Sequence, residues 1–456
     1  MANKLGNQSN VKAQGNSTGY WARGITCTLW LTMSSESFGE QILYQQLCTM
    51  AFRSPMVLLG LFLLCRMLSN VQSAPIKITR ETFRECRRGQ WAGIPADCCP
   101  PKTIDGPIID FSPPKLNPSK PLRVRKALQC LSGKELRTYT KKLQKGYRLM
   151  RALPDTDPRS YARQYGIHCA YATGSFIQDG SNNLTIDVHV GWYFHPWHRA
   201  YVYFHEKILQ KLLNDTEFSL HYWNYDNTNS LDKNEALHDG GCYKSGLYFP
   251  PMYNDPTKAT FQWNRSERAF DPKRPADLAF DGTRYNISLG PPSFPDNLTL
   301  AQIIWRNNEL MHRTFLTWGN STIAFMGKEY REGDPQALGI ANGAGMQEKY
   351  SHTSMHCYVG GKMFEPKSAP EDPVFFPFHA NLERLWDVWL SLGDDHRNPT
   401  SSDWLDGEFL LWDENAVMNR FRVRDFLSAE ALGYTYQKAN VDSWVNFDTS
   451  SPYPES

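Results

Sequence analysis

Histidine is the residue type whose spacing in this sequence points most directly to chemistry. More than half of its 12 histidines fall into two groups. His352 and His356 are four residues apart, which would place two imidazoles on one face of a helix, near enough to share one metal ion. The first group is His168, His189, His195 and His198, and the second is His352, His356 and His379.

Imidazole ligands without thiolates or carboxylates favour particular metals. Neutral imidazole binds copper, zinc, iron and nickel, whereas a thiolate would be oxidised at a site that handles O₂. Two sets of three histidines on facing helices would build two adjacent three-coordinate metals, each with an open side for a bridging ligand. Hydrolytic metal pairs usually have bridging carboxylates, and a zinc-protease motif would need Glu in place of Thr353. The pattern therefore favours copper and dioxygen, although any one histidine alone is better explained as a hydrogen-bonded core residue.

Helical and strand-like patterns surround these histidines. Residues 226–300 are rich in Asn, Asp, Pro and Gly and should be mostly loop, whereas residues 404–436 alternate like short strands. The patterns predict a mainly α fold with a four-helix-bundle core that holds the metal centre, long loops and a small β-rich C-terminal segment. Helices are expected from about Arg123 to Pro154, and over 196–213, 300–318 and 377–392.

Length and composition exclude several classes of protein. The 456 residues allow two to four domains of roughly 150 residues, or one large domain with long loops. Hydrophobic residues make up 41% and charged residues 21%, which excludes a disordered chain. No apolar run approaches the roughly 18 to 20 residues that span a bilayer, so no membrane span is expected. The 49 basic and 47 acidic residues nearly cancel, which argues against a nucleic-acid partner held by bulk charge.

The N-terminal residues 1–74 are expected to be a targeting leader. The apolar run 56–65 (MVLLGLFLLC) follows Arg53 and precedes V-Q-S-A at 71–74, a pattern typical of a signal peptide. The stretch before it is either an upstream extension or a transit peptide, because it is rich in Ser and Thr and poor in acidic residues. Six N-x-S/T sequons after this leader favour secretion, with the thylakoid lumen as the alternative. The sequons begin at Asn183, Asn214, Asn264, Asn286, Asn297 and Asn320.

A cluster of cysteines follows the leader. Cys86, Cys98 and Cys99 lie close together, which is typical of a disulfide-stapled segment in an oxidising compartment. A zinc site is the rival interpretation, but it would need a second C-x-x-C or His pair. The Pro-rich residues 100–121 should run extended over the surface, so residues 75–122 are expected to form a stapled N-terminal arm.

Ordered blocks of sequence carry a resemblance to one family. The blocks are L-P-D-T-D-P-R-S at 153–160, I-H-C-A-Y at 167–171, Y-W-N-Y-D at 222–226, M-Y-N-D-P at 252–256, M-G-K-E-Y-R-E-G-D at 326–334, D-P-V-F-F-P-F-H-A-N-L-E-R-L-W at 372–386 and D-W-L-D-G-E-F-L-L-W-D-E-N at 403–415. From about Cys86 to Tyr436, the sequence resembles the plant polyphenol oxidases, the catechol oxidase and tyrosinase family of type-3 copper proteins. Many blocks in the same order make this resemblance specific.

The resemblance implies roles for particular residues. Glu348, four residues before His352, matches a carboxylate that orients a water near the second copper, and that water would take the phenolic proton. The resemblance also implies the disulfides Cys86–Cys99 and Cys98–Cys169. Two copper ions would be held, the first by His168, His189 and His198 and the second by His352, His356 and His379.

The resemblance implies an activity as well. Small phenolic substrates would be oxidised from o-diphenols to o-quinones by O₂, which ends as water. Monophenol hydroxylation stays open, but Thr353 is a weaker water-holding partner than the Asn often linked with it, so we expect mainly diphenol oxidation. An O₂ carrier like the molluscan haemocyanin unit and a copper-free secreted relic are the alternatives.

Several positions depart from the family pattern. Ala172 stands where the family has a Cys that forms a thioether with the second histidine, so His189 should lose a covalent restraint. Phe378 replaces a histidine, which leaves the next residue as the ligand. His195, His221 and His312 also occupy positions of other residue types and are not expected to be ligands.

The expected substrate cavity departs from the pattern too. Pro366 aligns with the gate Phe of the family, so either Phe364 takes its place or the cavity is more open. Thr353 and Cys357 should line the side of the second copper.

The resemblance also divides the chain. Residues 123–400 would form the tyrosinase-type dicopper domain and residues 401–456 a β-rich closing segment and tail. Family precursors continue into a C-terminal domain that covers the copper site, and this shielding domain is expected to be absent because the sequence ends soon after Tyr436.

Overall fold

The protein is described here by a computed structural model. It describes residues 74–83, 89–91, 94–96, 99, 106–181, 184–228, 240–255, 257, 272–278, 298–335, 340–393 and 395–455. The chain divides into the units 1–72 and 73–456, and the fold below is that of the second unit. Apart from Ala74, the expected leader lies outside the described residues.

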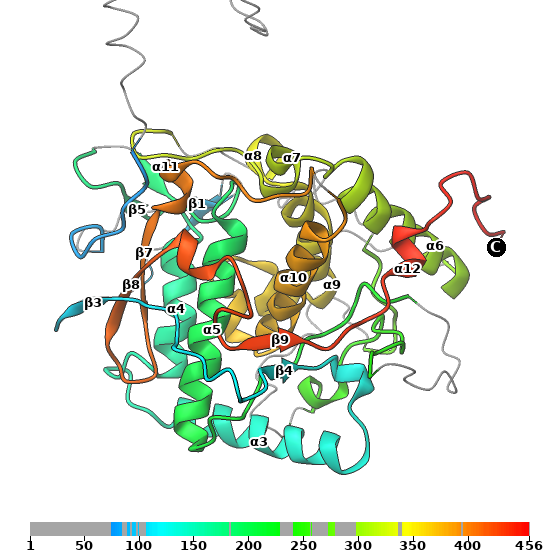
Figure 1. The fold of residues 1–456 in the computed structure, drawn as a ribbon, viewed down its shortest axis with the longest axis horizontal. Helices are drawn as coiled ribbons and strands as arrows, with labels where there is room; N and C mark the ends of the chain where they lie inside the picture. Colours follow the sequence, from blue (N-terminus) through cyan, green and yellow to red (C-terminus); the bar gives the residue numbers. More distant parts are fainter. Residues whose placement is uncertain are drawn as a thin grey trace, which may run out of the picture. The chain divides into compact units, whose positions relative to one another are not determined.

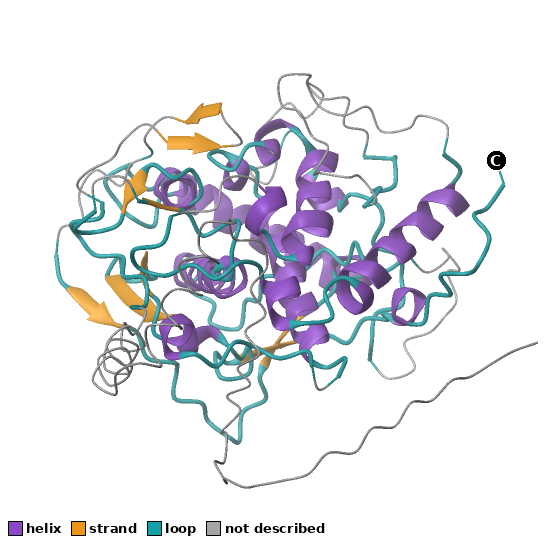
Figure 2. Cartoon of the chain, turned by 90° about the horizontal axis from the view of Figure 1, so that it is seen from above, coloured by secondary structure: helices purple, strands orange, loops and turns teal. Residues whose placement is uncertain are grey.

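A group of helices surrounds the centre of this unit (Figure 1). They are α4 (Tyr161–Tyr171), α5 (Phe194–Leu213), α9 (Thr353–Val359) and α10 (Phe375–Leu390), and α3 (Gly133–Arg151) packs against α4 and α5. Figure 2 shows the helices gathered together, with strands and loops around them. The predicted mainly α fold with a four-helix core is confirmed.

Local sequence signals explain where these helices begin and end. The Ser160 side chain accepts a hydrogen bond from the backbone N–H of Arg163 at the start of α4. Pro196 lies in the first turn of α5, where its missing N–H costs nothing, and Asn214 ends this helix in the left-handed region with φ 52°. Thr299 and Gln302 form a capping box that starts α6 (Leu300–His312).

The first predicted helix begins later than expected. Residues Arg123–Arg125 form strand β4, which pairs in parallel with β9 (Tyr434–Tyr436), and the helix starts at Gly133 after the N-cap Ser132. The expected start near Arg123 was wrong because a strand partner far along the chain overrides the local apolar spacing. Helix α4 was not predicted from its spacing.

Small sheets link the two ends of the unit. Strands β7 (Glu408–Trp412) and β8 (Met418–Arg422) form an antiparallel hairpin, and β3 (Ile108–Asp110) adds to β8 in parallel. In Figure 1 the cyan β3 lies beside this orange hairpin. The predicted β-rich segment after residue 404 is present, and one of its sheets includes β3 of the N-terminal arm. Two further antiparallel pairs are β1 (Gly89–Trp91) with β2 (Ile94–Ala96) and β5 (Phe176–Ile177) with β6 (Thr185–Ile186).

Short helical segments complete the described chain. The π-helix η6 (Arg313–Thr317) continues α6 through most of the range predicted as helix, and a second π-helix, η7 (Glu348–His352), precedes α9. The remaining segments are η1 (Leu128–Cys130), η2 (Pro251–Tyr253), α7 (Thr322–Met326), α8 (Ile340–Gly343), η8 (Gly361–Phe364), η9 (Ala369–Glu371), α11 (Ser402–Leu405), η10 (Val423–Phe426) and α12 (Asp442–Val445).

A buried ion-pair network fastens β4 and β9 to the helical core. The Arg125 guanidinium donates to Glu206 of α5 and to Glu383 of α10, each at 3.0 Å. The hydroxyls of Tyr434 and Tyr436 donate to Glu383 at 2.9 and 2.8 Å. Because Arg125, Glu206 and Glu383 are buried, each charge needs these partners to offset the cost of its burial.

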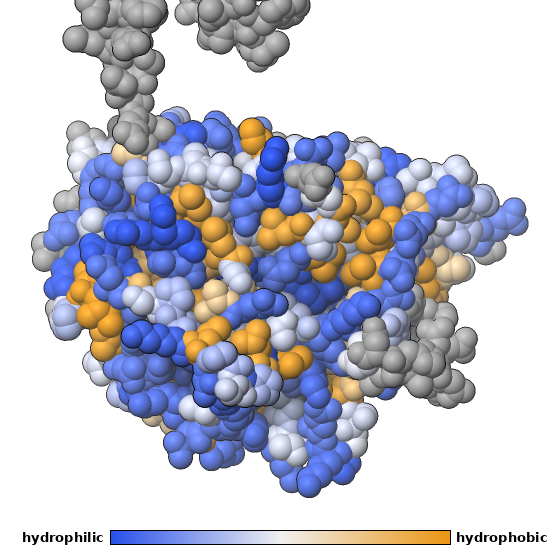
Figure 3. Space-filling model, in the orientation of Figure 1, coloured by the Kyte–Doolittle hydropathy of each residue, from blue (hydrophilic) through white to orange (hydrophobic). Residues whose placement is uncertain are grey.

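The surface mixes polar and apolar residues. Figure 3 shows hydrophobic residues scattered among hydrophilic ones on one face of the molecule. Within the described part of the chain, no helix combines the length and the apolar character that crossing a bilayer requires.

Candidate metal centre

The two histidine triads predicted from the sequence come together in the structure. Each histidine of a triad has one ring nitrogen that lies within 4.8 Å of a ring nitrogen of each of the other two histidines. The rings of His198 and His379 stack across the two triads with centroids 4.5 Å apart, and those of His189 and His352 lie 5.9 Å apart. The triads therefore face each other. They are His168, His189 and His198, and His352, His356 and His379.

Backbone carbonyls orient most of these rings. Where Nδ1 donates to a carbonyl, the ring is left with Nε2 as its lone-pair nitrogen. The Nε2 atoms of His168 and His198 lie 3.4 Å apart, and those of His352 and His356 lie 2.9 Å apart. The lone pairs thus converge within each triad. The backbone carbonyl that contacts Nδ1 belongs to Pro366 for His168, Phe194 for His198, Glu348 for His352 and Met363 for His356.

The surroundings keep these imidazoles neutral. Burial, and then the neighbouring histidines, hold the pKa values of His168, His198 and His352 well below their ordinary value. Burial lowers the pKa of His356 to about 3. Neutral imidazole is the form that binds a metal.

The ring nitrogens of His379 indicate whether a metal ion fits the centre. Both of its ring nitrogens are buried and have no hydrogen-bond partner among the described residues. A buried polar atom left unpaired is costly, and a metal ion would satisfy the inward nitrogen. The all-imidazole donor set suits copper, zinc, iron or nickel, so the residues present fit a pair of metal ions.

Glu348 lies between the triads without being part of either. Its Oε1 accepts a hydrogen bond of 2.7 Å from the backbone N–H of Val190, next to His189. Its Oε2 is buried and has no hydrogen-bond partner among the described residues. Burial raises the pKa of this carboxyl to about 7, against the opposing charge of His189. A carboxyl with such a pKa can hold or release a proton near neutral pH.

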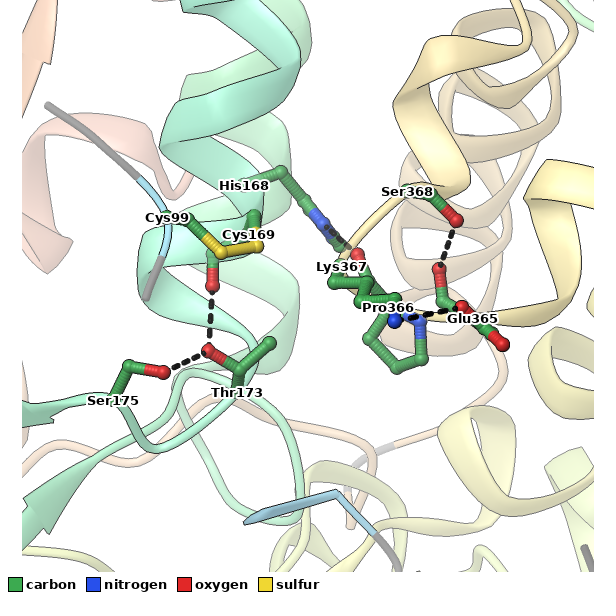
Figure 4. Close-up of a disulfide and its surroundings, with 9 residues drawn as sticks. All are labelled: Cys99, His168, Cys169, Thr173, Ser175, Glu365, Pro366, Lys367 and Ser368. Atoms are coloured by element: carbon green, nitrogen blue, oxygen red, sulfur yellow. Dashed lines mark hydrogen bonds and ion pairs between the residues drawn. A yellow bond between two sulfur atoms is a disulfide. The ribbon is translucent and has the colours of Figure 1, made fainter. Parts of the chain in front are cut away.

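The residues expected to line the cavity lie near the second triad. The Thr353 hydroxyl donates to the backbone carbonyl of Glu348 at 2.9 Å, and Cys357 and Phe364 are buried. Pro366 has a role that the sequence did not indicate, because its carbonyl accepts the Nδ1–H of His168 (Figure 4). That contact joins two residues 198 positions apart in the sequence, and no local sequence pattern indicates it.

The other histidines singled out in the sequence lie outside both triads. The ring of His195 stacks on Phe325 with centroids 5.0 Å apart. His221 stacks on Tyr139, and Nδ1 of His312 contacts the carbonyl of Trp444 at 3.0 Å. Their expected exclusion from the ligand set agrees with this placement.

The disulfides differ from those implied by the resemblance. Cys169, next to His168, is bonded to Cys99 (Figure 4), so the expected pairings Cys98–Cys169 and Cys86–Cys99 are corrected. Two adjacent cysteines give no sequence signal for which of them reaches a distant partner. Cys86 and Cys98 lie outside the described residues. A second disulfide, Cys130–Cys242, spans 112 residues and was not predicted.

Known protein families match the part of the chain that contains this centre. The family described as the common central domain of tyrosinase matches residues 158–392, which include all six histidines, and the polyphenol oxidase middle domain matches residues 398–450. A polyphenol oxidase of Malus domestica is 35% identical over 368 residues, 79% of this chain and 54% of that protein. An aureusidin synthase of Antirrhinum majus is also 35% identical, over 77% of this chain and 57% of its own length.

Solved structures agree with these relatives. A polyphenol oxidase from Grenache grape, Vitis vinifera, matches with a TM-score of 0.66 and 30% identity, over 81% of this chain and 99% of that structure. A latent apple tyrosinase matches with a TM-score of 0.62 and 33% identity, over 74% of this chain and 67% of that structure. The chain spans about half the length of the curated relatives it matches.

The expected secretion is corrected by the same relatives. Polyphenol oxidases of Malus domestica, Vitis vinifera and Vicia faba carry the description chloroplastic, with which the thylakoid-lumen alternative is compatible. A short apolar run with small residues after it does not specify which membrane translocates a chain, and N-x-S/T sequons can occur without being used.

Family membership follows from this agreement between site and sequence. The matched central domain contains every residue of both triads, and the grape structure is matched over nearly its whole length at 30% identity. The chain belongs to the tyrosinase family, and its relatives are the plant polyphenol oxidases.

Proposed function

We propose that this chain is a polyphenol oxidase that oxidises o-diphenols to o-quinones and reduces O₂ to water, with two copper ions held by the two triads. The observation that carries the proposal is the pair of facing histidine triads, in which buried nitrogens of His379 have no other partner among the described residues. His168, His189 and His198 would hold one ion, and His352, His356 and His379 the other. Bound copper would supply the electron exchange between two diphenols and one O₂, which yields two quinones and two waters.

The residues of the chain would then handle the proton and the position of the substrate. The Oε2 of Glu348 is buried and has no hydrogen-bond partner among the described residues, so it can hold a water that accepts the phenolic proton. Thr353, Cys357, Phe364 and Pro366 would line the substrate cavity. Cys357 and Phe364 are buried and the other two are half-buried, which limits the water that reaches the cavity. Oxidation of o-diphenols is proposed as the main activity, with weak hydroxylation of monophenols.

The division of the chain is part of the same proposal. We place a stapled arm at 75–122, the dicopper domain at 123–400 and a β-rich closing segment at 401–456, behind a leader at 1–74. The parallel pairing β3–β8 and the bridge between Lys77 and Glu408 support an arm and a closing segment that fold together.

The first experiment counts copper and follows O₂ uptake with catechol. The wild-type chain should bind two copper ions and consume O₂, and the double variant His352→Ala/His356→Ala should lose one copper and all uptake. His195→Phe is the matched control, because His195 is buried and stacked on Phe325 but lies in neither triad. Reversible O₂ binding without turnover would show a carrier, and a chain that binds no copper would show a relic.

A further inference from the structure

His189 is held differently from the other five histidines of the triads. It lies in the loop between β6 and α5, and its side chain is 11% exposed. A ligand on a loop needs its orientation fixed by contacts, because no helix limits its movement. The others lie on regular elements: His168 on α4, His198 on α5, His352 at the end of η7, His356 on α9 and His379 on α10.

Asp187 makes two contacts that restrain this ligand. Its Oδ1 accepts a hydrogen bond of 2.8 Å from the backbone N–H of His189 and lies 3.2 Å from Nδ1 of the same ring. The first contact closes a tight turn, and the second fixes the rotation of the ring about its side-chain bonds. Of the ring contacts described for the six histidines, this is the one made to a carboxylate.

The neighbouring residues of the loop make other contacts. The backbone N–H of Val188 donates to the carbonyl of Tyr171 at 2.9 Å, which places the loop beside the end of α4. The next residue there, Ala172, is buried and has a methyl group that can make no bond to the ring. Val190 has φ 60°, a strained conformation for a β-branched residue, so the loop is held against its own preference.

We propose that Asp187 is a positioning residue of the first triad, which keeps the proton of His189 on Nδ1 and presents Nε2 to the metal. A carboxylate partner makes an imidazole a stronger donor than a carbonyl does, and loss of such partners typically weakens metal binding by about 10- to 100-fold. The inference rests on the proposed dicopper function.

Zinc titration of the metal-free chain tests the role without catalysis. Zn²⁺ binds imidazole ligands and is redox-inert, so wild type should take up two equivalents. Asp187→Ala should retain one equivalent at wild-type affinity and bind the other about 10- to 100-fold more weakly. Asp187→Asn should fall between them, because its amide oxygen still accepts both contacts without the charge. Asp448→Ala, which removes the same kind of turn at Ser450, should match wild type.

A spectroscopic measurement gives a second readout. In long-range ¹H–¹⁵N spectra of histidine-labelled, metal-free protein, His189 should carry its proton on Nδ1 in wild type and on Nε2 in Asp187→Ala. The resonance is assigned by its loss in His189→Gln. Because this experiment needs no metal, it separates the role of Asp187 from the proposed chemistry.

The outcomes are distinct. The inference is overturned if Asp187→Ala binds both zinc equivalents like wild type, if both weaken equally, or if wild-type His189 is protonated on Nε2. If Asp187→Ala does not fold, Asp187→Asn decides by the same criteria. The wild-type chain could bind two zinc equivalents and yet fail to oxidise catechol when loaded with copper. That result would refute the proposed function and would not affect the positioning role.

Discussion

The backbone N–H of Val190 donates a 2.7 Å hydrogen bond to Oε1 of Glu348, so one carboxylate beside the second triad holds the loop that carries His189 of the first. Val190 has φ 60°, and such a conformation persists only where surrounding contacts enforce it. The two triads are therefore coupled through a side chain that belongs to neither.

Substitution of Glu348 should separate its two roles. In Glu348→Gln the amide oxygen can still accept from Val190, but the side chain can no longer take a proton. We expect kcat for catechol to fall by about 10²-fold or more while two copper ions remain bound. Glu348→Ala should also loosen the loop and lower the copper content. Metal analysis with O₂-uptake kinetics checks this, and wild-type kcat in Glu348→Gln would refute the role as a base.

Thr353 should influence the choice between monophenols and diphenols. Its hydroxyl donates to the Glu348 carbonyl at 2.9 Å, so it can hold a water only by accepting a hydrogen bond from it. Thr353→Asn adds a longer polar group, and we expect the ratio of monophenol to diphenol rates to rise about 2- to 10-fold, the effect of one hydrogen bond. Thr353→Val is the matched control of the same shape. An equal ratio in all three proteins would contradict the prediction.

The site could be predicted more completely than the fold around it. The spacing of His352 and His356 is a local property, and the spacing of the histidines gave two groups that contain all six members. The resemblance to the polyphenol oxidases then implied the two triads and left out His195. The start of α3 was misplaced because β4 pairs with a strand about three hundred residues later, where Arg125 also contacts Tyr436. Long-range partners of this kind have no local signature.

Disulfide pairing shows the same limit. Cys98 and Cys99 are equivalent in the sequence, and only the folded chain places Cys99 against Cys169. Cys130 and Cys242 carry no spacing signal, because 112 residues separate them. The carboxylate of Asp187 was also missed, although a D-x-H sequence before a ligand is a feature that could have suggested it.

The Cys130–Cys242 disulfide should contribute substantially to stability. It joins η1 to Cys242, which forms a β-bridge with Ala439, and so closes a loop of 112 residues. Loss of the disulfide would raise the conformational entropy of the unfolded chain. Cys130→Ala/Cys242→Ala should lower the free energy of unfolding by about 2–5 kcal/mol in denaturant melts. Reductant should lower the stability of wild type more than that of the double variant, in which Cys99–Cys169 remains. Equal sensitivity of both proteins to reductant would contradict the prediction.

The buried pair of Arg125 and Glu206 should make stability depend on acid. Despite burial, which alone would raise it, contacts with Arg125 and Arg123 lower the pKa of Glu206 from its ordinary 4.5 to about 2. A carboxyl whose pKa is lower in the folded chain stabilises it fully above the ordinary value and loses that contribution as the pH falls toward the folded value.

Glu206→Gln tests this dependence. At pH 7 the variant should be less stable by about 3–5 kcal/mol, because Arg125 keeps a buried charge with one partner fewer. The difference from wild type should shrink as the pH falls from about 4.5 toward 2, where Glu206 becomes protonated in wild type. Denaturant melts at pH 7, 5 and 3.5 measure it, with Glu217→Gln as the control, since Glu217 forms an exposed pair with Lys120 and should change stability little. A difference that is the same at every pH would show that Glu206 contributes through packing and not through its charge.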